Sequence, residues 1–162
     1  MHESFEVEYS GCGAGDEPEL IEKFVGYLDR IRGRILTWNG KKFDMPVLIY
    51  RSLINSVQMP FLFKLGSKWE SYRQRYAEDW HCDLMDVMSG FGASKFAKLD
   101  LVASAIGLPG KLGGDGSIVG KMYNEGRIQD IKGYAECDVL NLYALYMRWQ
   151  YITGSIFNFG QK

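Results

Sequence analysis

The sequence predicts one α/β domain over residues 1–162, in which strands and helices alternate along the chain. Residues 5–9 alternate apolar and polar side chains, as a half-buried strand does, and residues 34–38 form a compact β-prone run. Apolar residues at helical spacing follow each run, over residues 16–31 and again from about residue 44. The length suits one hydrophobic core, and the chain contains no linker or internal repeat.

The first two helices have recognisable start and stop signals. Asp16 is a good N-cap with Pro18 just inside the helix, and Gly33 is expected to end it. A second helix is predicted to begin near Asp44, with Pro46 tolerated in its first turn. We expect the apolar residues of this second helix to face mainly inward. They are Val47, Leu48, Leu53, Ile54 and Val57.

After an aromatic, loop-rich stretch over residues 58–80, helices are predicted over residues 83–88, 99–106 and about 127–151. A glycine-rich segment over residues 109–116 lies before the last helix and fits no phosphate-binding motif. Gly120-Lys121 has Asp115 where a Walker A motif needs glycine and Met122 where it needs Ser or Thr. No predicted strand directly precedes this segment, so a surface turn is expected there.

The composition is that of an ordinary globular domain, with 46% hydrophobic residues and a net charge of −1. This charge disfavours a protein that coats duplex nucleic acid but allows an enzyme that grips a few nucleotides. Cys12, Cys82 and Cys137 form no C-x-x-C, so we expect free thiols, which fit a reducing cytoplasm. No apolar run reaches bilayer length, so a cytoplasmic protein without membrane contact is predicted.

Two short motifs carry the polar residues that best suit chemistry. Asn39-x-x-x-Phe43-Asp44 joins the β-prone run to the second helix, and Tyr134-x-x-x-Asp138 lies inside the last helix. Residues four apart share a helix face, so Tyr134 and Asp138 are predicted to lie side by side on an otherwise apolar stripe. A carboxylate on such a stripe is costly to bury unless it is paired, hydrogen-bonded or metal-bound, so Asp138 is expected to have a partner.

In this order and separation, the two motifs resemble the second and third exonuclease motifs of the DEDD superfamily, in the subgroup that uses tyrosine. From about residue 16 to 151 the chain is similar to predicted 3′–5′ exonucleases related to the proofreading domain of B-family DNA polymerases. The aromatic and basic run over residues 68–76, the segment over residues 81–86 and the loop Pro109-Gly110-Lys111-Leu112 support this resemblance.

The resemblance implies an RNase H-like fold, with a mixed sheet flanked by helices and incomplete at its N-terminal end. It also implies hydrolysis of terminal nucleotides from single-stranded DNA or frayed DNA 3′ ends, with RNA left open. Two divalent ions, Mg²⁺ or Mn²⁺, would be held by four carboxylates, and Asp44 and Asp138 match the last two. By the same resemblance Tyr134 would orient the attacking water, and Asn39 and Phe43 would contact the terminal nucleotide.

Two further residues are weaker candidates. Lys111 is a candidate substrate contact in the glycine-rich loop, and Asp83 is a candidate for the edge of the site. Asp86, three residues after Asp83, is favoured instead as an acidic residue at a helix start.

The sequence departs from the family pattern at the first motif, because no D-x-E precedes Asp44. Glu6-Val7-Glu8 and Glu17-Pro18-Glu19 are near misses, and residues 5–9 match the family's third strand better than its first. We therefore expect a chain that starts inside the domain, as a fragment or a natural truncation. With two of four carboxylates, the polypeptide alone is expected to be inactive or weakly active. The alternative is a non-catalytic domain that binds nucleic acid or a partner and keeps a degenerate exonuclease site.

Several residues also have purely structural interpretations, which the sequence leaves open. Asp44 could be a helix N-cap, Asn39-Gly40 a turn, and Tyr134 a core tyrosine with a satisfied hydroxyl. The run over residues 68–75 could contact a single strand, or its Lys and Arg stems could pack over the aromatic rings.

Overall fold

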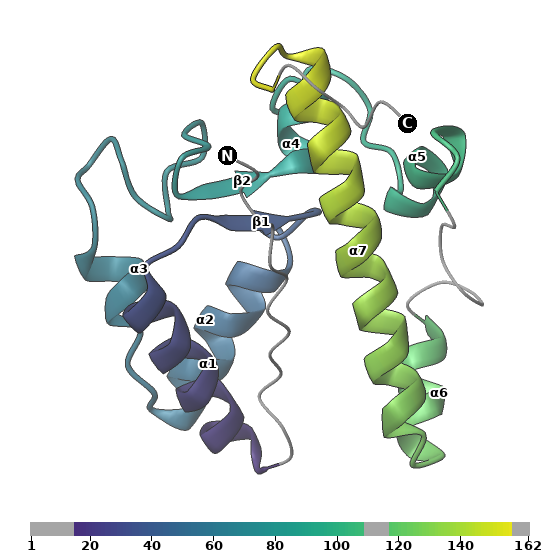
Figure 1. Cartoon of the computed structure of the whole chain (residues 1–162). Coiled ribbons are helices and arrows are strands. Elements are labelled where there is room, and N and C mark those ends of the chain that lie inside the picture. Colours follow the sequence, from purple (N-terminus) through teal and green to yellow (C-terminus); the bar gives the residue numbers. More distant parts are fainter. Residues whose placement is uncertain (1–14, 109–116, 157–162) are drawn as a thin grey trace, which may run out of the picture. The chain divides into compact units, whose positions relative to one another are not determined.

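The structure, a computed structural model, describes residues 15–108 and 117–156 (Figure 1). Its elements form a mixed α/β structure. In chain order they are α1 (Glu17–Ile31), β1 (Ile35–Thr37), α2 (Asp44–Asn55), α3 (Pro60–Lys64), β2 (His81–Asp83), α4 (Leu84–Met88), α5 (Leu99–Ala105), α6 (Ser117–Asn124) and α7 (Ile128–Ile152). The strand predicted over residues 5–9, Cys12 and the glycine-rich loop with Lys111 lie outside the described residues.

Helix α1 confirms the predicted start and stop signals. The Asp16 side chain caps it by accepting the Glu19 N–H at 3.1 Å, and Pro18 lies in the first turn. The helix ends at Arg32, which adopts the left-handed conformation with φ 47°. Its buried stripe repeats at helical spacing and consists of Ile21, Val25 and Leu28.

The sheet consists of β1 and β2, and it joins segments far apart in the chain. In Figure 1 the two arrows lie side by side and run the same way, with α2 and α3 in the connection between them. A parallel pair needs such a crossover connection. Strand β1 confirms the predicted run over residues 34–38, whereas β2 was not predicted, and its last residue, Asp83, was expected to start a helix. Its sequence, His81-Cys82-Asp83, has no strand pattern, yet all three residues are buried.

The described chain divides into two compact units, and the division passes through both strands. Unit 1 takes the described residues up to Ile35 and those from Gly40 to His81. Unit 2 takes Leu36–Asn39 and the described residues from Cys82 onward. Whether the 162 residues act as a single domain stays a prediction.

Unit 1 has a core rich in aromatic and large apolar side chains. Tyr72 is almost fully buried and makes edge-to-face contacts with Phe61 and Trp80, at centroid distances of 5.5 Å and 5.0 Å. Its hydroxyl donates to the Gly33 carbonyl at 2.7 Å, which ties the loop-rich stretch to the end of α1. The buried residues of this core are Ile21, Val25, Leu28, Met45, Met59, Phe61, Leu62 and Tyr72.

Unit 2 has a smaller aliphatic core built on α7. Leu142 and Leu145 of α7 pack with Leu84 of α4 and Leu99 of α5. Helix α7 also contacts α6, and it confirms the helix predicted over residues 127–151. Helix α6 was not predicted, because its eight residues include Gly120 and show too short a pattern to separate from the loop before it.

The prediction that the apolar residues of α2 face inward is wrong for most of them. Leu53 and Ile54 are 70% and 67% exposed, and Val47 is also exposed. The buried positions are Met45 and Ser52, seven residues apart on one stripe. Helix α2 packs against α1, and Leu48 and Val57, two of the five predicted positions, are half-buried against the core of unit 1 as expected.

Two sequence-based absences can be compared with the described residues. Among the described residues, Cys82 and Cys137 form no disulfide. Within residues 15–108 and 117–156, none of the helices is both long enough and apolar enough to cross a lipid bilayer.

Candidate active site

Asn39 and Asp83 are brought together at the end of the two strands of the sheet. Asn39 follows β1 with a left-handed backbone, φ 66°, which asparagine tolerates better than most residues. Its backbone N–H donates to Oδ1 of Asp83 at 2.8 Å, across 44 residues of sequence. Parallel strands end at the same edge of a sheet, so this bond fixes the turn after β1 to the end of β2.

The Asp83 carboxylate is fully buried, although it stands at the N-cap position of α4. Its side chain makes no capping bond to that helix, and Oδ1 accepts the Asn39 N–H instead. A hydrogen bond to an ionised acceptor is stronger than a neutral one, which helps to offset the burial of the charge. Asp83 therefore stabilises the turn that carries Asn39.

Asp44 and Phe43 lie in unit 1, at the start of α2. Asp44 is the first residue of the helix, and the N-cap position belongs to Phe43, which makes no side-chain capping bond. The interpretation of Asp44 as the N-cap is therefore wrong by one residue. Its exposed carboxylate still lies in the first turn, where the helix dipole favours a negative charge. Phe43 is 62% exposed, so its ring is open to a ligand.

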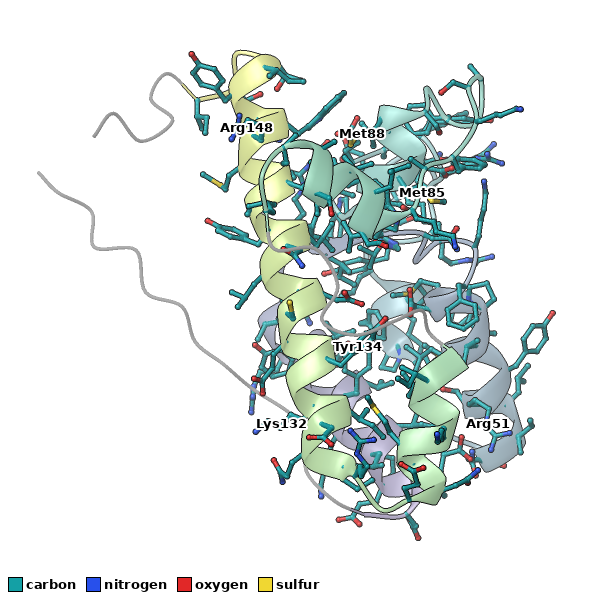
Figure 2. The ribbon with its side chains drawn as sticks, turned by 90° about the vertical axis from the view of Figure 1, so that its right-hand side faces the viewer. Arg51, Met85, Met88, Lys132, Tyr134 and Arg148 are labelled. Carbon is teal, nitrogen blue, oxygen red and sulfur yellow. The ribbon has the colours of Figure 1, made fainter. Side chains whose placement is uncertain are left out.

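Tyr134 and Asp138 lie in unit 2 and share one face of α7, as their spacing predicted. Both side chains are half-buried, and the face continues to the buried Leu142 and Leu145. Figure 2 shows Tyr134 on this helix between the labelled Lys132 and Arg148. A half-buried carboxylate beside a phenol can hold a cation or a water on one side while the apolar stripe limits solvent on the other.

The candidate residues are thus divided between the units. Phe43 and Asp44 belong to unit 1, while Asn39, Asp83, Tyr134 and Asp138 belong to unit 2. Lys111 lies outside the described residues. Among residues 15–108 and 117–156, no three His, Cys, Asp or Glu side chains gather closely enough to hold a metal ion. The oxygen donors of these residues suit Mg²⁺ or Mn²⁺ in kind.

Comparison with known protein families identifies the family of this chain. A family model described as "Predicted 3'-5' exonuclease related to the exonuclease domain of PolB" matches residues 1–160. The chain belongs to this exonuclease family. No curated protein and no solved structure matches it. Because the match spans both acidic motifs, the resemblance drawn from Asn39 to Asp44 and from Tyr134 to Asp138 is confirmed at the level of the family.

For a member of an exonuclease family, the buried polar residues of unit 2 are the feature that sequence reasoning missed. Asp86 and Asn141 are almost fully buried, although Asp86 was favoured as an ordinary acidic residue at a helix start. Ser89 holds the end of α4 by donating to the Asp86 carbonyl at 2.8 Å and accepting the Gly92 N–H at 3.1 Å. The residues around Asp86 show no clear helical period. The available sign of its burial was that both of its neighbours, Met85 and Val87, are apolar.

Proposed function

We propose that this chain is the metal-dependent 3′–5′ exonuclease domain that its family suggests, acting on terminal nucleotides of single-stranded DNA or frayed DNA ends. The observation that carries the proposal is the Tyr134 and Asp138 pair on one half-buried face of α7, inside the family match. A carboxylate on this face is a hard oxygen donor of the kind that Mg²⁺ and Mn²⁺ bind. The DEDD motif pattern favours the same assignment.

In this proposal the chain's own residues divide the work between charge and position. Asp138 and Asp44 each offer one carboxylate to a divalent ion, and Tyr134 orients the attacking water. Asn39 and Phe43 contact the terminal nucleotide, with the Asn39 turn held by Asp83. Two divalent ions, when bound, activate water near neutral pH and stabilise charge on the attacking and leaving oxygens.

The same reasoning limits the activity that we propose for this polypeptide. The sequence contains no D-x-E before Asp44, so two of the four carboxylates of the family pattern are absent. Half of the negative charge that binds the ions is then missing. We therefore propose weak metal binding and little or no hydrolysis by this chain alone.

A second candidate function is a non-catalytic domain that binds single-stranded nucleic acid or a partner. The exposed aromatic and basic side chains over residues 68–76 favour it, because such a surface can bind a strand without any chemistry. The two candidates differ at Asp44 and Asp138, because a domain that has lost the chemistry has no need to bind metal there.

The experiment is a nuclease assay on 5′-labelled single-stranded DNA with Mg²⁺ or Mn²⁺. We expect at most slow shortening from the 3′ end, lost in Asp138→Asn and in Asp44→Asn. Glu136→Gln is the matched control for Asp138, since it makes the same carboxylate-to-amide change two residues away on another face of α7. Fast hydrolysis by the wild-type chain would refute the half-site account. Slow hydrolysis that survives in Asp138→Asn would refute the site assignment.

A further inference from the structure

A pocket of about 490 Å³ lies on unit 1, formed by part of α3 and by the loop-rich stretch that follows it. Its walls come from a single run of chain and combine apolar, hydroxyl and cationic side chains. They include Phe63, Leu65, Ser67, Lys68, Arg73 and Gln74. All of these residues belong to unit 1, and none of them belongs to the candidate active site.

The pocket is built on a tight loop. Gly66 has φ 82°, and a Cβ there would stand 2.0 Å from the Glu70 carbonyl oxygen, so glycine is required at this position. The same carbonyl accepts the Ser67 N–H at 2.7 Å, and the Ser67 hydroxyl accepts the N–H groups of Trp69 and Glu70. The loop also borders buried residues of the unit 1 core, Leu62 on one side and Tyr72 on the other. The backbone conformation of Gly66 and the hydrogen bonds of Ser67 therefore hold the pocket wall in a defined conformation.

The charge of this stretch is opposite to that of the whole chain. Residues 62–76 contain four Lys or Arg side chains and one carboxylate, whereas the protein carries a net charge of −1. Lys68 lies over the Trp69 ring at 4.9 Å, and the Arg73 guanidinium lies over the Phe63 ring at 4.9 Å. In the described part of the chain, no carboxylate forms an ion pair with Lys68 or Arg73.

Two aromatic rings, Phe63 in the pocket wall and Trp69 beside Lys68, remain open to solvent despite these contacts. Trp69 is 69% exposed and Phe63 is 52% exposed. If the Lys and Arg stems served only to cover the rings, less of the rings would be exposed. Exposed rings interleaved with cations form the surface that single-stranded nucleic acid prefers, because bases stack on the rings while phosphates meet the cations.

We propose that this pocket, lined in part by Lys68 and Arg73, forms together with the adjacent exposed ring of Trp69 a binding surface for single-stranded nucleic acid. The proposal rests on the exonuclease function in that the bound strand would be its substrate. An acidic peptide would match the charges but would leave the aromatic faces without a stacking partner. Duplex DNA would meet the charges with its bases already stacked on one another. The combination therefore favours a single strand.

The test is fluorescence anisotropy of a labelled oligothymidylate with the full chain, in EDTA so that no divalent ion contributes. We expect Trp69→Ala to weaken binding on the order of 10-fold, as removal of one base stack does. Lys68→Ala/Arg73→Ala should weaken binding and flatten the dependence of log K on log salt by about 0.7 for each phosphate that no longer meets a cation. Melting temperatures of the variants are measured alongside, and all of these side chains are exposed, so folding should persist.

The matched control is Lys23→Ala/Arg30→Ala on α1, in the same unit. It removes the same two charges, and Arg30 also lies over an aromatic ring, that of Tyr27 at 5.6 Å. The proposal predicts that this control keeps the wild-type dissociation constant and salt slope. It is overturned if the pocket variants bind as the wild type does, or if the control is weakened as much as they are. It is also overturned if duplex DNA or polyglutamate binds as tightly as the oligothymidylate.

These outcomes are separable from failure of the proposed exonuclease function. Each proposal has its own readout: anisotropy in EDTA reports the binding surface, and metal-dependent hydrolysis reports the exonuclease site. Loss of binding in Trp69→Ala, together with hydrolysis that Asp138→Asn leaves unchanged, would support the binding surface and reject the exonuclease proposal. Hydrolysis that depends on Asp138 but not on Trp69, Lys68 or Arg73 would do the reverse.

Discussion

The two units bury different kinds of side chain. The core of unit 1 is apolar and aromatic, and its stack of Phe61, Tyr72 and Trp80 is completed by one hydroxyl bond. Unit 2 has a smaller core of leucines, and it also buries two carboxylates, Asp83 and Asp86. Burying a carboxylate is costly unless it has hydrogen-bond partners, and Oδ1 of Asp83 accepts the Asn39 N–H. Unit 1 is thus stabilised by apolar packing, whereas unit 2 also depends on hydrogen bonds to buried acidic groups.

The largest expected effect lies in the aromatic core of unit 1. Phe61 is completely buried, so Phe61→Ala should lower the free energy of unfolding by about 3–5 kcal/mol, through reduced burial and a cavity. If each core stabilises its own unit, hydrogen exchange should accelerate in residues 15–35 and 40–81 more than in α7. Equal acceleration in α7 would show that the two units unfold as one.

An effect of about 1.5–3 kcal/mol is expected for Asp83→Ala, which removes a charged acceptor from a buried hydrogen bond. The Asn39 amide should then exchange faster. Asp83→Asn keeps an oxygen acceptor and should protect that amide better than alanine does, which separates the bond from the mere loss of volume. If the Asn39 amide exchanges at the same rate in both variants and in the wild type, the bond does not hold the turn.

A smaller effect is expected for Tyr72→Phe, which keeps the ring and removes only the bond to the Gly33 carbonyl. The free energy of unfolding should fall by about 0.5–1.5 kcal/mol, as measured by urea denaturation. Tyr27→Phe is the control, because that hydroxyl belongs to a side chain exposed on α1. An equal fall in the free energy of unfolding in both variants would mean that the hydrogen bond to the Gly33 carbonyl does not stabilise the fold.

The smallest predicted effect is a loss of stability of unit 1 at alkaline pH. Burial raises the pKa of Tyr72 above its ordinary value near 10, and the charge of Arg32 opposes this only in part. Because the pKa of Tyr72 is higher in the folded state than in the unfolded state, its protonated hydroxyl contributes fully to stability below the unfolded-state pKa. This contribution is lost as the pH rises through the folded-state pKa. Ultraviolet titration should show one tyrosine that ionises later than the others and is absent in Tyr72→Phe. A late tyrosine that persists in Tyr72→Phe would contradict this assignment.

Local signals allowed much of the fold to be predicted. The Asp16 cap, the Pro18 first turn and the apolar stripe of α1 act within a few residues of one another, so the sequence displays them directly. Strand β2 was missed because three buried residues show no period. The inward face of α2 was wrongly assigned because apolar character does not tell which stripe meets α1.

The candidate site was predictable in its parts but not in its connections. The spacing of Tyr134 and Asp138 fixes their shared helix face, and the structure has that helix. The bond from Asn39 to Asp83 joins residues 44 apart, and nothing in either motif announces it. Burial of Asp86 likewise depends on packing around α4, which local patterns do not encode.

The central proposal is that Asp44 and Asp138 are each ligands for a divalent ion, and a Mn²⁺ titration followed by NMR line broadening tests it most directly. We predict weak binding in which the amides of residues 43–45 and 137–139 broaden first, with the effect lost in Asp138→Asn and kept in Glu136→Gln. Broadening centred elsewhere, or unchanged by Asp138→Asn, would contradict the claim and favour the non-catalytic binding domain.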